Sequence, residues 1–267
     1  MSFKNWYSKI NAKIAVMSAL IGLKRGEYKD ITQEVKKGLY EVLLEKFDQD
    51  EKESISGIER LRKFLNSSSS KIQILTNYNS PGDEKDRYRL KSMTIGEVSE
   101  RSSIKYLWAT ILFKMIRAFR PDVCFELGTN IGISAAYQAS ALKLNNKGQL
   151  VTFELSDSKA KLANENFQKL KLDNARAIAG RFSDTVENEL KKFKTIDYAF
   201  IDGHHDEKAT IDYFDLIEPY LSKKSFIVFD DINWSGGMRR AWDQLKNDKR
   251  FVLSVDLTRL GICFVRK

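Results

Sequence analysis

Short apolar blocks alternate with longer amphipathic segments through the second half of the chain. Seven blocks have the length and composition of β-strands, and they run from Val123 to Leu127, Leu150 to Glu154, Ala175 to Ala179, Ile196 to Asp202, Phe226 to Asp230, Phe251 to Asp256 and Ile262 to Val265. Helix-length segments separate the first five blocks, as the crossovers between parallel strands require. This alternation predicts an α/β fold, in which a Rossmann-like, doubly wound and mostly parallel seven-stranded sheet carries helices on both faces.

The last two blocks are joined differently. Only residues 257–261 lie between them, which is too short for a parallel crossover. We therefore expect these two strands to form an antiparallel hairpin at the C-terminal end of the sheet.

Apolar residues in the first part of the chain recur at intervals of three and four, which is the helical period. Examples are Val35, Leu39, Val42, Leu43 and Phe47, followed by Ile58, Leu61 and Leu65. We predict a helical N-terminal region over residues 1–66. Its apolar stripe must pack on the main domain or on a second subunit, which would give a homodimer. Docking of the segment from Ile14 to Leu23 on a membrane surface is the alternative.

Residues 67–103 are polar and rich in turn-forming residues, notably at 67–70 and 77–87. This composition predicts a linker or a lid that folds over a substrate, and the pattern does not choose between them. Residues 104–267 form the predicted main domain.

The composition narrows the class of protein. A chain of 267 residues with 42% hydrophobic residues can bury one sizeable core and an appendage. The net charge of +9 is spread over segments of mixed sign, so we do not predict a nucleic-acid partner. Cys124 and Cys263 lie in apolar blocks, as buried thiols do, and a reducing cytoplasm fits them best.

The apolar segment from Ile14 to Leu23 raises the question of a targeting signal. Lys24 and Arg25 follow it, where a signal peptide would have a small-residue cleavage site. The segment is also too short to span a bilayer. We therefore predict neither a signal peptide nor a membrane span.

The first predicted strand runs into a turn with two glycines, Gly128 and Gly132. These glycines let the backbone turn tightly and approach a ligand, and the helix that begins near Ile133 directs free amide groups toward it. Glu154 ends the second strand, where a carboxylate can accept hydrogen bonds from both hydroxyl groups of a ribose. These features predict a ligand that contains adenosine.

NAD and S-adenosylmethionine both contain adenosine. The dinucleotide motif needs a third glycine, and Ala135 and Ala136 follow Ser134 instead. Glu126, at the start of the turn, suits the ammonium group of a methionine moiety or the nearby backbone that holds it. The sequence therefore favours S-adenosylmethionine, and a nicotinamide-dependent oxidoreductase is the less favoured alternative.

Three carboxylates follow the next two strands, Asp202 at the end of the fourth and Asp230 with Asp231 at the end of the fifth. The carboxyl ends of neighbouring parallel strands lie close together, so these side chains could converge on one point. Crowded carboxylates call for a cation, and an all-oxygen set suits Mg²⁺ or a similar divalent ion. The alternative is that Asp202 merely ends a strand and one of the adjacent pair caps a turn.

Both histidines of the chain, His204 and His205, lie in the loop after Asp202. His205 can point toward the same pocket, and the ordinary pKa of a histidine, about 6.5, lets it accept a proton at neutral pH. We predict His205 as the catalytic base, with His204 as its support. Trp234 is expected either to form an apolar wall for an acceptor or to pack in the core.

With these residues the chain from about Ile104 to Lys267 resembles the class I methyltransferases. Within them it resembles the metal-dependent O-methyltransferases related to the catechol, caffeoyl-CoA and macrolide-sugar enzymes. The start of the turn, from Glu126 to Thr129, is typical of that branch.

The resemblance implies roles for individual residues. Residues expected to bind the cofactor are Glu126, Gly128, Thr129 and Gly132 for the methionine and ribose, Glu154 for the ribose diol, Ser183 with Asp184 for the adenine, and Asp202. Arg181 and Phe182 depart from the small residues expected beside the adenine. The family's metal ligands fall on Asp202, Asp230 and Asp231, and the macrolide-sugar branch has a histidine at the position of His205.

The predicted function is transfer of a methyl group from S-adenosylmethionine to a hydroxyl of a small molecule. Mg²⁺ would chelate two neighbouring acceptor oxygens, and His205, with Asp202 as the second catalytic residue, would remove the proton. The histidine favours a sugar or polyol acceptor over a catechol-like one. A non-catalytic S-adenosylmethionine-binding regulatory or assembly protein is the main alternative.

Overall fold

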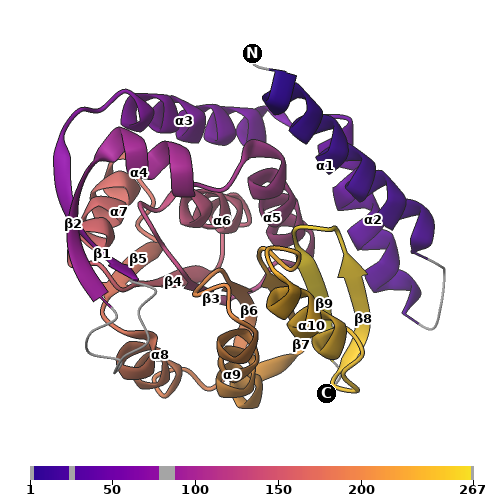
Figure 1. Ribbon diagram of the computed structural model, residues 1–267. Coiled ribbons are helices and arrows are strands. Elements are labelled where there is room, and N and C mark those ends of the chain that lie inside the picture. The colour runs from indigo at the N-terminus through magenta and orange to yellow at the C-terminus, as the bar shows by residue number, and fades with distance from the viewer. Residues whose placement is uncertain (1–2, 24–27, 78–87, 266–267) are drawn as a thin grey trace.

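A seven-stranded sheet forms the centre of the computed structural model, which describes residues 3–23, 28–77 and 88–265 (Figure 1). The strands are β3 (Val123–Leu127), β4 (Gln149–Glu154), β5 (Ala175–Ala179), β6 (Ile196–Ile201), β7 (Leu221–Phe229), β8 (Phe251–Asp256) and β9 (Gly261–Val265). They lie in the order β5-β4-β3-β6-β7-β9-β8. Strands β3 to β7 pair in parallel, and β9 is antiparallel to both β7 and β8. The predicted sheet and its C-terminal hairpin are confirmed.

Helices cover both faces of this sheet. Helices α5 (Tyr106–Phe119), α6 (Ile133–Leu144) and α7 (Asp157–Lys169) contribute to one apolar cluster, and α8 (Phe182–Leu190), α9 (Glu207–Ile217) and α10 (Gly236–Leu245) to the other. A short 3₁₀ helix, η2 (Glu218–Tyr220), leads into β7. Along β6, Tyr198 and Phe200 face the first cluster and Ala199 and Ile201 the second, because side chains alternate along a strand.

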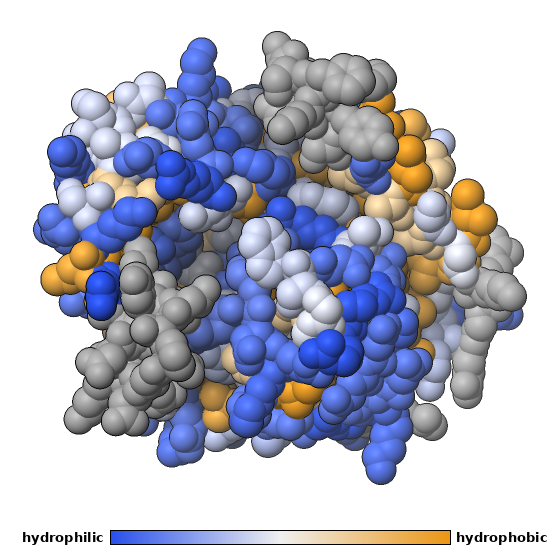
Figure 2. Space-filling model, viewed as in Figure 1, coloured by the Kyte–Doolittle hydropathy of each residue, from blue (hydrophilic) through white to orange (hydrophobic). Residues whose placement is uncertain are grey.

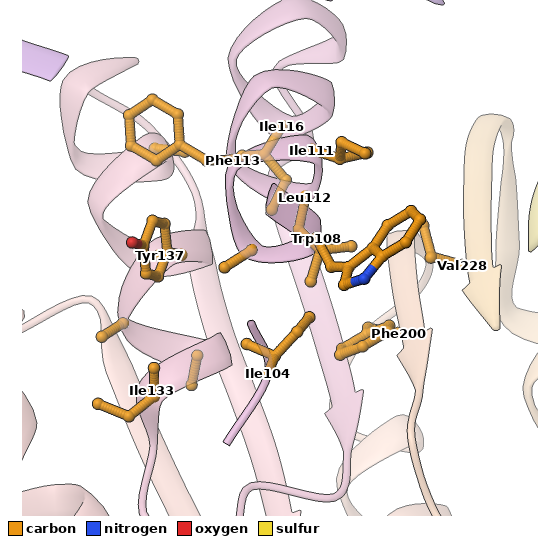
Figure 3. Packing of buried hydrophobic residues seen from close by; sticks show 14 of the residues in the cluster. Ile104, Trp108, Ile111, Leu112, Phe113, Ile116, Ile133, Tyr137, Phe200 and Val228 are labelled. Carbon is orange, nitrogen blue, oxygen red and sulfur yellow. The ribbon is translucent and has the colours of Figure 1, made fainter. Parts of the chain in front are cut away.

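Helix α5 is apolar nearly all round, and every residue from Trp108 to Ile116 is buried. Trp108 packs near Phe200 of β6 and Val228 of β7 in this first cluster (Figure 3). The core therefore holds the central strands rigidly under the edge where their carboxyl ends lie.

The N-terminal region consists of α1 (Phe3–Gly22), α2 (Lys29–Leu43) and α3 (Gln49–Asn66). Helix α2 packs on α5, with a methyl group of Met115 lying against Gly38, and α3 packs on α6. The side chain of Lys114 is buried between Glu51 (2.6 Å) and Glu41 (2.9 Å). The apolar stripe of α2 and α3 is thus covered by the main domain of the same chain.

Helix α1 contacts α2 and leaves apolar residues on the surface (upper right in Figure 2). Ile14, Met17 and Ile21 are all more than half exposed. Among the described residues, no helix is both long and apolar enough to cross a membrane. A homodimer through these helices stays a prediction.

Residues 67–103 contain regular structure that their polar composition did not predict. An antiparallel hairpin of β1 (Lys71–Asn77) and β2 (Tyr88–Thr94) leads into α4 (Ile95–Ser102). Thr94 and Glu97 form a reciprocal capping box at the start of α4, a signal that was present in the sequence. Contacts between β1 and α7 fix the hairpin beside the main domain. The polar run 78–87 lies outside the described residues, and a lid role stays a prediction.

Candidate active site

The turn after β3 is held against the neighbouring strands. The backbone N–H groups of Gly128 and Thr129 both donate to the carbonyl of Phe153, and that of Asp202 donates to the carbonyl of Leu127. Gly128 has φ 113°, and a Cβ atom there would lie 2.0 Å from the carbonyl oxygen of Asp202. Only glycine fits this position, because both the conformation and the space exclude a side chain.

Glu126 lies beneath this turn with no exposed surface. Its carboxylate accepts hydrogen bonds from Thr152 Oγ1 (2.6 Å) and Gln138 Nε2 (2.7 Å). Burial raises the pKa of Glu126 to about 7, although hydrogen bonds from Ser134, Thr152 and Gln138 favour the ionised form. The residue ties β3 to β4 and α6.

Glu154 organises the other side of the turn. Its two oxygens accept the backbone N–H groups of Asn130 (2.8 Å) and Ser156 (3.0 Å). Each carboxylate oxygen has a second lone pair, so Glu154 can still accept a hydroxyl. Asn130 has φ 49°, and its side-chain oxygen and nitrogen are buried with no hydrogen-bond partner in the described part of the chain. Such atoms call for a polar ligand.

A cavity of about 630 Å³ opens beyond β4, β5 and β6. Its lining includes Leu155, Phe182, Ser183, His204 and Tyr213. His204 Nδ1 lies 2.5 Å from the hydroxyl of Tyr213, and the ring also contacts Phe182. His204, which was predicted to support His205, therefore lines this cavity. Charged residues, Arg181, Asp206, Lys208 and Asp212, also line it, and its aromatic part beside Phe182 suits a flat heterocycle.

Ser183 and Asp184 both lie in the first turn of α8, but only Ser183 lines the cavity. Its hydroxyl donates to Asp184 Oδ1 (2.8 Å), and both residues are exposed.

Two of the three aspartates at the tips of β6 and β7 lie beside His205. The Nε2 atom of His205 is 3.7 Å from Asp202 Oδ1 and 3.8 Å from Asp231 Oδ2. Burial, and next the charge of Asp230, raise the pKa values of Asp202 and Asp231, and Arg259 partly offsets this.

The backbone at the site is strained. His204, His205 and Asp231 all have positive φ, at 61°, 44° and 51°. Residues other than glycine rarely adopt this conformation, and it is concentrated at functional sites. The strain supports a functional role for the two loops that carry these residues.

Arg259 was not anticipated from the sequence. Its Nε donates to Asp230 Oδ1 (2.9 Å) and one terminal nitrogen to Asp230 Oδ2 (2.8 Å), so both oxygens of Asp230 are engaged. Nε also lies 3.4 Å from Asp231 Oδ1. The side chain of Asp230 is 1% exposed, and that of Arg259 is 31% exposed.

This arrangement does not fit the predicted cation site. Both oxygens of Asp230 already accept from a guanidinium, whose positive charge opposes a divalent ion at the same carboxylate. Across residues 3–23, 28–77 and 88–265, no group of three or more His, Cys, Asp or Glu side chains is arranged to hold a metal ion.

Trp234 follows these loops and is 71% exposed, so it is not part of the core. The centroid of its ring lies 6.2 Å from that of His205. Of the two predicted roles, only a wall beside His205 is compatible with this position.

Residues 125–232 match a protein family described as "Methyltransferase domain". The matched span contains the glycine turn, Glu154, Asp202, His205 and both aspartates after β7. The matched family and the observed fold both agree with the resemblance to class I methyltransferases read from the sequence.

Solved structures share the fold. An O-methyltransferase from Bacillus cereus, in complex with S-adenosylhomocysteine, is 16% identical with a TM-score of 0.56, over 86% of this chain and 96% of that chain. The O-methyltransferase TomG from Streptomyces achromogenes, involved in tomaymycin synthesis and in complex with S-adenosylmethionine, is 16% identical with a TM-score of 0.55, over 85% and 94%.

An S-adenosylhomocysteine-bound methyltransferase from Podospora anserina is 20% identical with a TM-score of 0.52, over 63% of this chain and 82% of that chain. No curated protein matches the sequence significantly.

Proposed function

We propose that the protein transfers a methyl group from S-adenosylmethionine to a hydroxyl group of a small-molecule acceptor. The observation that carries this proposal is the position of His205 between the carboxylates of Asp202 and Asp231, next to a glycine turn within a methyltransferase domain. The cofactors bound in the O-methyltransferases of similar fold support the choice of methyl donor.

The residues around the turn fit this cofactor. The second lone pairs of Glu154, whose Oε1 also lies 3.7 Å from Lys159 Nζ, suit the ribose hydroxyls. The cavity lined by Leu155, Phe182, Ser183 and His204 suits the adenine. The buried, unpartnered side chain of Asn130 lies in the turn, where a methionine moiety would approach. When bound, S-adenosylmethionine supplies a methyl group made electrophilic by its sulfonium.

His205 removes the proton of the acceptor hydroxyl in the proposed mechanism. The acceptor oxygen forms its bond to the methyl carbon as the carbon–sulfur bond breaks, and the electron pair stays on sulfur. Asp202 and Asp231, with oxygens 3.7 and 3.8 Å from Nε2, stabilise the positive charge that the imidazole gains. Trp234 forms an exposed wall against which a sugar ring or a catechol-like ring can stack.

We derive no step through a divalent cation. Of the three predicted metal ligands, Asp230 forms hydrogen bonds to the guanidinium of Arg259 through both of its oxygens. Asp231 has one oxygen 3.4 Å from Arg259 Nε. Dependence on Mg²⁺ therefore stays a prediction from the sequence, with Arg259 as the observation against it.

Calorimetric titration with S-adenosylhomocysteine and with NAD tests the cofactor. We expect S-adenosylhomocysteine to bind and Glu154→Ala to weaken it at least tenfold, because two hydroxyls lose their acceptor. Binding of NAD alone would support the oxidoreductase alternative and refute the proposal.

A mass-shift screen with a deuterated methyl donor then tests transfer to sugars, polyols and catechols. Binding of S-adenosylhomocysteine without transfer to any hydroxylated compound would favour the non-catalytic regulatory alternative.

A further inference from the structure

We infer that the guanidinium of Arg259 neutralises the carboxylate of Asp230 and thereby keeps a divalent metal ion out of this site. This inference rests on the proposed function, because Asp230 directly precedes Asp231, one of the two carboxylates beside the base. It assigns Arg259 as a positioning residue that acts through Asp230. The inference predicts that the wild-type site does not bind a divalent cation, unlike the site expected from the sequence.

The hairpin between β8 and β9 holds Arg259 in place before any ligand arrives. The carbonyl of Arg259 accepts the backbone N–H of Ile232 (3.0 Å), next to the aspartate pair. The side chain of Asn233 donates to the carbonyl of Thr258 (2.8 Å), and Asp256 Oδ1 accepts the N–H of Thr258 (2.8 Å). The backbone of the turn from Thr258 to Arg259 is thus hydrogen-bonded to the loop after β7. This places the guanidinium of Arg259 close to Asp230.

The contact itself has the geometry of a strong ion pair. Two parallel N–H···O bonds of 2.9 Å and 2.8 Å join the guanidinium to Asp230, whose carboxylate has almost no exposed surface. Bidentate pairs of this kind are stronger and more specific than a contact to a point charge. A metal ion would have to displace Arg259 and leave its charge without a partner, which is costly at a partly buried site.

The charges around Asp230 also oppose a divalent ion in the presence of Arg259. Arg259 is the guanidinium that pairs with Asp230 and lies 3.4 Å from Asp231, and Asp202 and Asp231 lie beside His205. Without Arg259, the three carboxylates would form a crowded acidic set of the kind that binds divalent ions. Removing the arginine should therefore create a cation site that the wild-type protein does not offer.

The test uses Mn²⁺ alone as the probe, because its free form is counted directly by electron paramagnetic resonance. The full-length wild type, Arg259→Met and the double variant Arg259→Met/Asp230→Asn are titrated without chelator. We expect Arg259→Met to bind one Mn²⁺ per chain at least tenfold more tightly than the wild type, and the double variant to lose this gain. Arg240→Met is the matched control, since Arg240 pairs with both oxygens of Glu207 on the exposed surface, through Nε to Oε1 and a terminal nitrogen to Oε2.

Stoichiometric binding of one Mn²⁺ per chain by the wild type would overturn the inference, and this arm needs no variant to fold. A folded Arg259→Met that gains no Mn²⁺ affinity would overturn it too. Calorimetry with S-adenosylhomocysteine on the same samples separates the two proposals. Failure of the wild type to bind S-adenosylhomocysteine refutes the proposed function, and the Mn²⁺ titration still tests the role of Arg259.

Discussion

Glu126 makes the stability of the domain depend on pH in a direction that can be worked out. Burial raises the pKa of its carboxyl group from 4.5 to about 7. The native state therefore holds this proton more tightly than the unfolded chain does. The stabilisation is complete below about pH 4.5 and is lost as the pH rises toward about 7. A pKa difference of about 2.5 corresponds to about 3 kcal/mol of unfolding free energy.

The variant Glu126→Gln keeps the shape of the side chain and does not titrate. We expect the free energy of unfolding of the wild type, relative to this variant, to fall by about 3 kcal/mol between about pH 4.5 and pH 7.5. Urea unfolding followed by circular dichroism at several pH values measures this difference. Glu187→Gln, in an exposed ion pair with Lys191, measures the same chemical change on the surface. A difference between wild type and Glu126→Gln that does not vary with pH would refute the burial argument.

Three further predictions concern single side chains. His205→Ala should lower methyl transfer about 10²- to 10⁴-fold in single-turnover assays while S-adenosylhomocysteine affinity changes little, and an equal loss of both would contradict its role as base. Gly128→Ala should destabilise the protein by several kcal/mol in thermal unfolding, since its Cβ would meet the carbonyl of Asp202, and an unchanged melting temperature would contradict the turn geometry. Lys114→Ala should cost about 1–3 kcal/mol because buried Glu51 loses one of its two cations and keeps Arg117 Nε at 3.1 Å, and a cost below about 0.5 kcal/mol would place the pair among surface ion pairs.

The strands could be predicted because a buried parallel strand leaves a simple pattern. Strands β3, β5 and β8 begin and end at the predicted residues, and β4, β6 and β9 differ by one residue at one end. Strand β7 begins earlier than predicted, at Leu221, because its first part contains Lys223 and Lys224, which are exposed and break the apolar run. The hairpin of β1 and β2 was missed for the same reason, since its strands pair with each other and bury few side chains.

Only those residues of the candidate site that directly follow a predicted strand could be placed from the sequence. Asp202 and Asp230 follow neighbouring strands, and the structure puts both in the environment of Arg259. The hydrophobic pattern of the sequence does not show which side chain each carboxylate pairs with. His204 shows this limit, because it lies one residue from His205 and yet belongs to the cavity beside Phe182 and Tyr213.

The position of Arg259 follows from topology and could have been found by taking the predicted hairpin one step further. Strand β9 is antiparallel to β7, with Gly261 opposite Phe229. The residues just before β9 must then lie beside the residues just after β7, at the edge where the parallel strands end. Arg259, in that short turn, is therefore within reach of Asp230 and pairs with it. In a sheet that ends in an antiparallel hairpin, the hairpin turn therefore belongs to the active-site edge, and its charged residues determine which cations the carboxylates can accept.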